Sequence, residues 1–131
     1  MQSVHQNPTI ENDGWTLLSA EQRAALAPDM FSLPTKAERE ALSVGAAAKL
    51  LFDIETRSGG KVVDRGTERM WVIVKSRREK NYVGVLDNNP GGADNLNLHA
   101  GDLILFGPEH ICEIGKPPRD YIVEKYGTSF F

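Results

Sequence analysis

The chain contains a single cysteine, Cys112, among its 131 residues. An intramolecular disulfide is therefore impossible, which fits a reducing compartment. No apolar run approaches the roughly 20 residues that a membrane-spanning helix needs. The polar N-terminal residues also lack the basic and apolar regions of a secretory signal. We therefore expect a cytoplasmic protein that does not associate with membranes.

An excess of basic residues is also missing. The chain has 15 lysines and arginines against 18 aspartates and glutamates, which gives a formal net charge of −3. This balance disfavours nucleic acid as the main partner, because nucleic-acid-binding proteins usually carry a basic footprint. The best basic cluster is formed by Lys75, Arg77, Arg78 and Lys80, and Glu79 interrupts it. We interpret this cluster as the solvated turn of a hairpin.

What is present is typical of a globular domain: 40% of the residues are hydrophobic and 25% are charged. Residues 1–14 are polar and predict a flexible tail, whereas residues 15–131 predict a single domain. A chain of this length buries about two thirds of its unfolded surface, so it needs no disulfide or metal to fold.

Two short helices are predicted ahead of the strands. Gln22 follows Ser19 by three residues, and Glu38 follows Thr35 by three residues. Both pairs have the spacing of a capping box, in which each side chain satisfies a backbone donor of the first turn. Leu18 and Leu26 are expected to anchor the first helix. Helices this short are not stable alone in water, so they must pack against the rest of the fold.

About five strands are predicted after these helices, from β-branched and aromatic residues in short apolar or alternating runs. They cover residues 47–56, 69–76, 81–87, 102–106 and 110–114. Residues 57–68 predict a mobile loop, and residues 119–127 fit a short helix slightly better than an extended segment. Gly45 and Gly101 are expected to adopt positive φ in turns. Helices segregated from an antiparallel sheet indicate an α+β fold, here with a small, strongly curved sheet or open barrel.

The connection between the predicted hairpin and the next strand is rich in side-chain oxygens. Counted from Asp87, Asn89 and Gly92 fall at positions 3 and 6 of an EF-hand loop. However, Gly91 stands at position 5, and Leu98 stands at position 12, where a bidentate glutamate is required. We interpret the segment as a turn in which Asn and Asp side chains bond their own backbone, and we expect no metal.

His110 and Cys112 are a second candidate site. If residues 109–113 form a strand, both side chains point to the same face. They would then be two zinc ligands, or a thiol beside a base. Nothing in the sequence marks the further ligands or the orienting group that such sites need, and a buried cysteine is more often a small hydrophobe. The Gly-Gly-Lys at residues 59–61 lacks the Ser or Thr of a phosphate-binding loop.

Trp71 opens the clearest predicted strand. One interpretation makes it a core anchor. The other makes it an exposed contact for a partner protein, since Trp and Arg are enriched at binding hot spots, with Glu68 and Arg69 as a polar rim.

Four short segments resemble the bacterial domain-of-unknown-function family 2314 and its immunity-protein-like relatives. Family members show a Trp-containing strand, a G-x-L-x-N-x-P segment, a G-D that opens a strand, and an H-I strand. Here these are Trp71, then Gly84, Leu86, Asn88 and Pro90, then Gly101 and Asp102, then His110 and Ile111. The similarity covers residues 42–114. It implies no catalytic residues, and it implies a protein that binds and neutralises a partner toxin.

The sequence therefore predicts a non-catalytic protein-binding module, an immunity protein whose partner is a cognate toxin or effector, with no cofactor. Its acidic charge suits a basic toxin surface. The predicted binding residues are Asp64, Glu68, Arg69, Trp71, Asp87, Asn88, Asn89 and Asp94. The alternative is a small barrel that binds a small ligand or single-stranded nucleic acid. That alternative would use Trp71, Tyr82, Arg77 and Lys75. A third and weaker hypothesis is an enzyme that uses His110 and Cys112.

Overall fold

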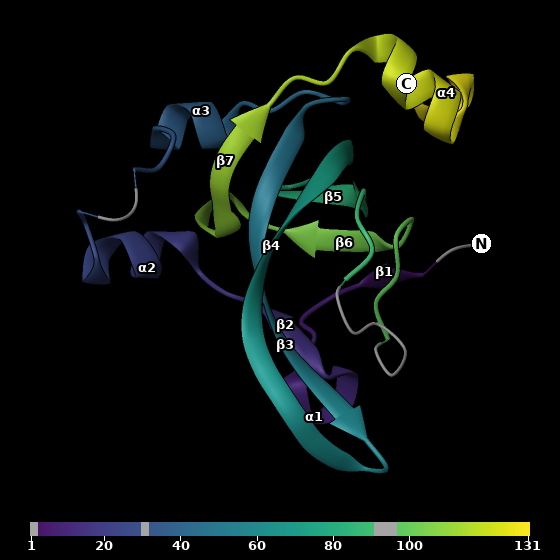
Figure 1. Ribbon diagram of the computed structural model, residues 1–131. Coiled ribbons are helices and arrows are strands. Elements are labelled where there is room, and N and C mark those ends of the chain that lie inside the picture. Colours follow the sequence, from purple (N-terminus) through teal and green to yellow (C-terminus); the bar gives the residue numbers. More distant parts are fainter. Residues whose placement is uncertain (1–2, 30–31, 91–96) are drawn as a thin grey trace.

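A computed structural model describes residues 3–29, 32–90 and 97–131. The fold is α+β, with a strongly curved, open half-barrel sheet and short helices around it (Figure 1). The strands are β1 (Val4–His5), β2 (Trp15–Leu17), β3 (Ala47–Ser58), β4 (Lys61–Arg78), β5 (Asn81–Leu86), β6 (Leu103–Phe106) and β7 (Ile111–Gly115). The helices are α1 (Ile10–Asp13), α2 (Ala20–Leu26), α3 (Lys36–Glu40) and α4 (Arg119–Tyr126), with 3-10 turns η2 (Pro108–His110) and η3 (Thr128–Phe130).

The sheet differs from the prediction in its strand count and in one direction. In the described part of the chain it has seven strands in the order β1-β6-β5-β4-β3-β2, and β7 pairs with β3 next to β2. β1 runs parallel to β6, and every other pairing is antiparallel. The prediction of about five antiparallel strands was wrong because β1 and β2 have only two and three residues, too few to show a pattern.

The segment expected to be a loose tail belongs to the fold over its described residues. Val4 pairs with Leu103 and His5 with Ile104, so this segment extends one end of the sheet. His5 Nε2 lies 3.0 Å from Asp102 Oδ2. The hydroxyl of Thr9 accepts a hydrogen bond from the backbone of Asn12 and so caps α1. The pairing of β1 with β6 and the contact of His5 with Asp102 were concealed in the sequence, because the partner residues lie almost a hundred positions away.

Strands β3 and β4 form a long hairpin where a loop was expected. Gly59 and Gly60, at φ values of 58° and 80°, turn the chain between the paired residues Ser58 and Lys61. The hairpin arm is visible at the lower edge of Figure 1. Residues 61–67 are all exposed, so neither face of the arm requires the apolar alternation by which strands are recognised in a sequence. The predicted hairpin of β4 and β5 is confirmed.

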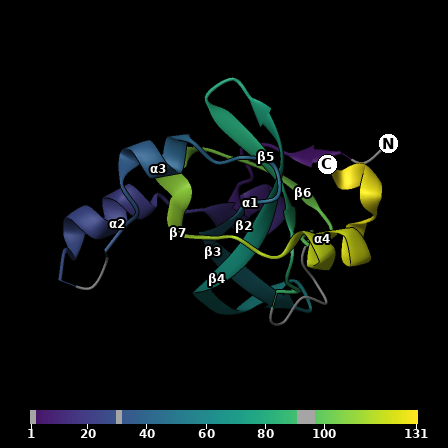
Figure 2. The same cartoon turned by 90° about the horizontal axis from the view of Figure 1, so that it is seen from above.

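The curved sheet has an apolar cluster on each face. The larger cluster lies inside the half-barrel, where Trp15, Phe52, Tyr82 and Phe106 are at most 1% exposed. The smaller cluster lies on the outer face, where η3 and α4 pack on residues of β3, β4 and β5. It consists of Ala47, Ile73, Val85, Ile122 and Phe130. Helix α4 lies at the opposite end of the molecule from α2 and α3 (Figure 2).

The predicted helix caps and turn glycines are largely confirmed. Thr35 and Glu38 form the complete capping box of α3, whereas Ser19 makes only its half of the box on α2. Leu26 was expected to anchor α2, but this was wrong: its side chain is 84% exposed, and Ala20 is the buried residue of the helix. Gly45 and Gly101 adopt φ values of 93° and 92°. In the described part of the chain, no helix is both long enough and apolar enough to span a bilayer.

Candidate functional site

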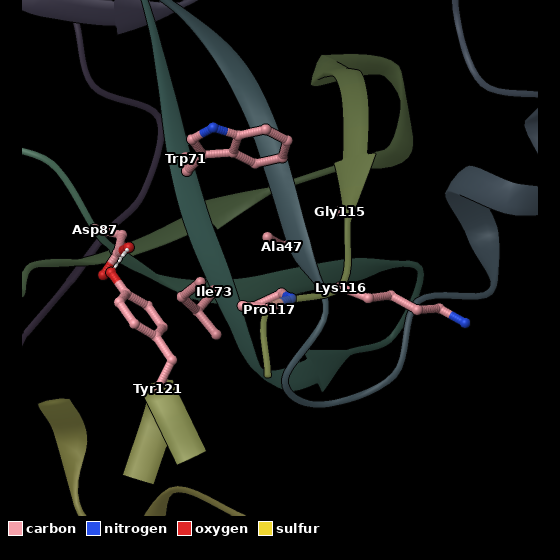
Figure 3. Close-up of a pocket in the computed structure, with 8 residues that line it drawn as sticks. All are labelled: Ala47, Trp71, Ile73, Asp87, Gly115, Lys116, Pro117 and Tyr121. Atoms are coloured by element: carbon pink, nitrogen blue, oxygen red, sulfur yellow. Dashed lines mark hydrogen bonds between the residues drawn. The ribbon is translucent and has the colours of Figure 1, made fainter. Parts of the chain in front are cut away.

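An open hollow of about 280 Å³ lies on the outer face of the sheet, where α4 leaves that face uncovered (Figure 3). Ala47 of β3 and Ile73 of β4 form its floor. The indole of Trp71 and the phenol of Tyr121 stand on opposite sides of the floor. The segment from Gly115 to Pro117 closes a third side, and Asp87 lies at the hydroxyl end of Tyr121. The lining is therefore mostly apolar, with few polar groups.

The backbone of Trp71 is held by hydrogen bonds, while part of its indole ring is exposed to the hollow. Its backbone N–H donates to Asn88 Oδ1 at 2.9 Å, and its carbonyl accepts from Asp87 N at 2.9 Å. The indole lies against the end of β7, where a Cβ on Gly115 would come within 3.4 Å of the ring. The ammonium of Lys49 lies 4.8 Å from the ring centroid. Trp71 is half-buried, so it acts both as a core anchor and as a wall of an open hollow.

The Asp87 carboxylate fastens α4 to the end of β5. It accepts hydrogen bonds from Tyr121 Oη at 2.7 Å, from Lys125 Nζ at 2.8 Å, and from Tyr126 Oη. Burial alone would raise the pKa of Asp87, but the bonds from Lys125, Tyr126 and Tyr121 outweigh it and lower this pKa below its ordinary value. Asp87 therefore stays ionised, and we call these four residues the α4 clasp.

The clasp also raises the pKa values of two of the groups that donate to Asp87. Burial, and then the hydrogen bond to Asp87, raises the pKa of Tyr126. The hydrogen bond to Asp87 raises the pKa of Lys125. Both donors keep their protons across the physiological range, so the clasp is a fixed set of charge-assisted hydrogen bonds rather than an acid–base pair poised to exchange a proton.

The predicted binding residues fall into two groups. Trp71 and Asp87 line the hollow and Asn88 binds the backbone of Trp71, whereas Asp64 lies in the exposed part of β4. At about 3.3 Å per residue, the seven positions between Asp64 and Trp71 separate them by roughly 23 Å. Glu68 and Arg69 lie on β4 between these points. A single small contact cannot include both groups.

Two asparagines hold the ends of the connection after β5. Asn88 binds the backbone of Trp71, and Asn89 Oδ1 accepts from the backbone of Ala100 at 3.2 Å. These bonds reach residues 17 and 11 positions away in the chain, so the expectation that such side chains bond their own turn backbone was wrong for these two asparagines. Asp94, which was also predicted to contact a partner, lies outside the described residues.

The structure does not bring Cys112 and His110 together as a thiol and its base. His110 lies in η2 rather than in a strand, and its Nδ1 accepts from Gly107 N at 2.9 Å. Burial lowers the pKa of His110. Burial also raises the pKa of the Cys112 thiol, which lies 3.2 Å from the carbonyl of Lys49. The expectation that both side chains share a strand face was wrong, because Pro108 starts a 3-10 turn there.

The residues proposed for stacking a single strand are already engaged in contacts within the fold. Tyr82 is fully buried, and its hydroxyl donates to the carbonyl of Arg39 at 2.7 Å. Arg77 covers the Tyr82 ring at 5.0 Å and donates to the carbonyl of Glu40. Lys75 lies over Phe130. Base stacking needs an exposed aromatic face, which Tyr82 does not present.

No family model, no curated protein and no solved structure matches this chain. The resemblance to family 2314 therefore stays a prediction from the motifs. Sequence reasoning missed Ala47, Pro117 and Tyr121 as site residues. The spacing of Tyr121, Ile122 and Tyr126 predicted a helix, but nothing in it indicated which face would meet Asp87.

Proposed function

We propose that the protein is a non-catalytic protein-binding module, an immunity protein that neutralises a partner toxin or effector. The observation that carries this proposal is the half-buried indole of Trp71, which forms one wall of an open apolar hollow on the outer face of the sheet. Large aromatic side chains at such concave positions dominate binding energies between proteins. The backbone bonds of Trp71 to Asp87 and Asn88 fix its position before a partner arrives, which lowers the entropic cost of binding.

The motifs shared with family 2314 support the same proposal from a separate direction. Trp71 and Asn88, which belong to those motifs, are joined by a hydrogen bond at the hollow. The resemblance implies a protein that works by binding, and we assign this binding to the hollow.

A small ligand in the hollow is the second candidate function. A volume of about 280 Å³ lies at the lower limit of small-molecule sites, which occupy about 300–1,000 Å³. Trp71 and Tyr121 would enclose a flat apolar molecule. The open side favours a side chain delivered by a protein over a ligand that must be surrounded.

The test is co-expression with the product of the adjacent reading frame. We expect the two proteins to co-purify and the chain to rescue growth when the neighbour is toxic. Trp71→Ala should weaken both effects, because it removes one wall of the hollow, while Val62→Ala at the exposed tip of the arm serves as the matched control. A neighbour that is neither toxic nor bound counts against the proposal.

A further inference from the structure

A second hollow adjoins the first on the outer face. It also measures about 280 Å³, and its lining includes Gly45, Ala46, Lys116, Pro117, Arg119 and Phe131. Lys116 and Pro117 line both hollows, and Ala46, which lines the second hollow, directly precedes Ala47 in the chain. The two hollows therefore meet along one edge, and together we call them the outer groove.

Exposed apolar side chains gather at this groove. Six large hydrophobic side chains are exposed in the described part of the chain. Tyr121 lines the first hollow, and Val44 and Phe131 line the second, with exposed fractions of 41%, 42% and 43%. Half of the exposed large apolar residues thus surround one feature, which is the pattern of an interaction surface rather than of scattered single residues.

The two hollows differ in charge. Among the residues that the structure describes, Asp87 is the only carboxylate that lines the first hollow, and the α4 clasp already binds it. The charged side chains of the second hollow are Lys116 and Arg119, and both are basic. In Figure 3 the Lys116 side chain points away from Trp71 and Tyr121. Among the described residues, its ammonium has no ion pair or hydrogen bond.

Arg119 is positioned in a similar way. Its guanidinium lies 4.0 Å from the centroid of the Phe131 ring and makes no ion pair within the described residues. Stacking holds the guanidinium in place and leaves its N–H donors available, and a planar guanidinium matches a carboxylate in two-point contact. The second hollow therefore presents two uncompensated cations above an apolar floor.

We propose that the outer groove binds an extended segment of the partner protein that carries an apolar or aromatic side chain next to acidic residues. The apolar side chain enters the hollow between Trp71 and Tyr121, and the carboxylates meet Lys116 and Arg119. This inference rests on the proposed protein-binding function and names the chemistry of its partner. Because the chain as a whole is acidic, these local cations determine which segment fits rather than accelerating its approach.

Selection from a library of random peptides displayed on phage tests the proposal with the intact protein as bait. Enriched peptides are expected to combine an aromatic or large aliphatic residue with a neighbouring aspartate or glutamate. The same peptides, labelled with fluorescein, then report affinity by fluorescence polarisation. Affinity is expected to fall as salt rises, since exposed ion pairs are screened.

Two charge reversals separate the groove from a general charge effect. Lys116→Glu is expected to weaken binding about fivefold or more, while Lys61→Glu, which makes the same charge change on the exposed arm, leaves it unchanged. Both positions are exposed, so both variants should fold. Equal losses in the two variants, enrichment of basic peptides, or no enrichment overturns the proposal. Binding of an oligothymidine that Lys116→Glu abolishes also overturns it, in favour of nucleic acid.

The outcomes also separate this inference from the function on which it rests. If a co-expressed partner binds but its affinity is insensitive to Lys116→Glu, the protein is a binding module that uses another surface, and the groove proposal fails. If acidic-aromatic peptides bind the groove but the adjacent gene product does not, the groove stands and the assignment of that particular partner fails.

Discussion

The two faces of the curved sheet are both apolar, yet they are covered to very different extents. On the inner face, Trp15, Phe52 and Phe106 are at most 1% exposed, because the sheet closes around them. On the outer face, α4 and η3 cover Ile73 and Val85 but leave the hollow beside Trp71 open. The inner face therefore supplies most of the stability. The outer face keeps apolar surface available, and a single helix held by Asp87 determines how much of it is exposed.

The largest effect is expected from truncation on the inner face. Phe52 is completely buried and packs against the indole of Trp15, with ring centroids 5.7 Å apart. Phe52→Ala should lower the free energy of unfolding by about 3–5 kcal/mol through lost burial and the cavity left behind. Urea denaturation measures this loss. A loss below about 1 kcal/mol would mean that the inner cluster is not the core of the fold.

A smaller effect is expected when the α4 clasp is cut. Asp87→Asn keeps the size of the side chain but removes the charge that Lys125, Tyr121 and Tyr126 bind. We expect a loss of about 1–3 kcal/mol, the usual range for hydrogen bonds to a charged group. Protection of α4 amides from hydrogen exchange should fall more than protection of β4 amides. Equal changes in both elements would show that α4 does not open independently.

The stability that the α4 clasp contributes on the outer face should depend on pH. The folded-state pKa of Asp87 is lower than its ordinary value of about 3.9. Its ionised form therefore stabilises the fold above that value, and the stabilisation is lost as the pH falls through the folded pKa. The stability difference between wild type and Asp87→Asn should be constant near neutral pH and shrink in acid. A difference that grows in acid would reverse the assigned sign.

The smallest effect is expected from Tyr121→Phe. This change removes the hydroxyl that donates to Asp87 at 2.7 Å but keeps the ring that lines the hollow. Since Tyr121 is 41% exposed, water replaces much of the lost bond, and we expect a loss of about 0.5–1 kcal/mol. Thermal unfolding of the variant and of the wild-type protein under the same conditions measures this loss of stability. A loss as large as that of Asp87→Asn would place most of the clasp energy in this one hydroxyl.

Local signals predicted the parts of the fold that local chemistry determines. The Thr35–Glu38 capping box, the positive φ of Gly45 and the β4–β5 hairpin depend on residues near one another in the sequence. Strand β1, in which Val4 pairs with Leu103, has only two residues and lies in a polar segment. No sequence pattern therefore indicates that it is a strand. The exposed end of β4 shows no alternation, because neither of its faces is buried.

The candidate site was predicted in part for the same reason. Trp71 and Asn88 stood out by residue type, and the structure joins them. The hollow itself also needs Tyr121, which lies 34 residues from its partner Asp87, and Gly115, which lies against the indole. Such contacts arise from the way α4 returns across the sheet, and single-sequence periodicity does not contain that information.

The most direct test of the central claim compares binding and stability in the same two variants. By calorimetry with the co-purified partner, Trp71→Ala should lower affinity by at least about thirtyfold, the range of a hot-spot residue, while unfolding remains cooperative. Phe52→Ala should lose stability but, at a temperature where it is folded, keep its affinity. If Trp71→Ala binds as tightly as wild type, the outer hollow is not the binding surface, and the account is wrong.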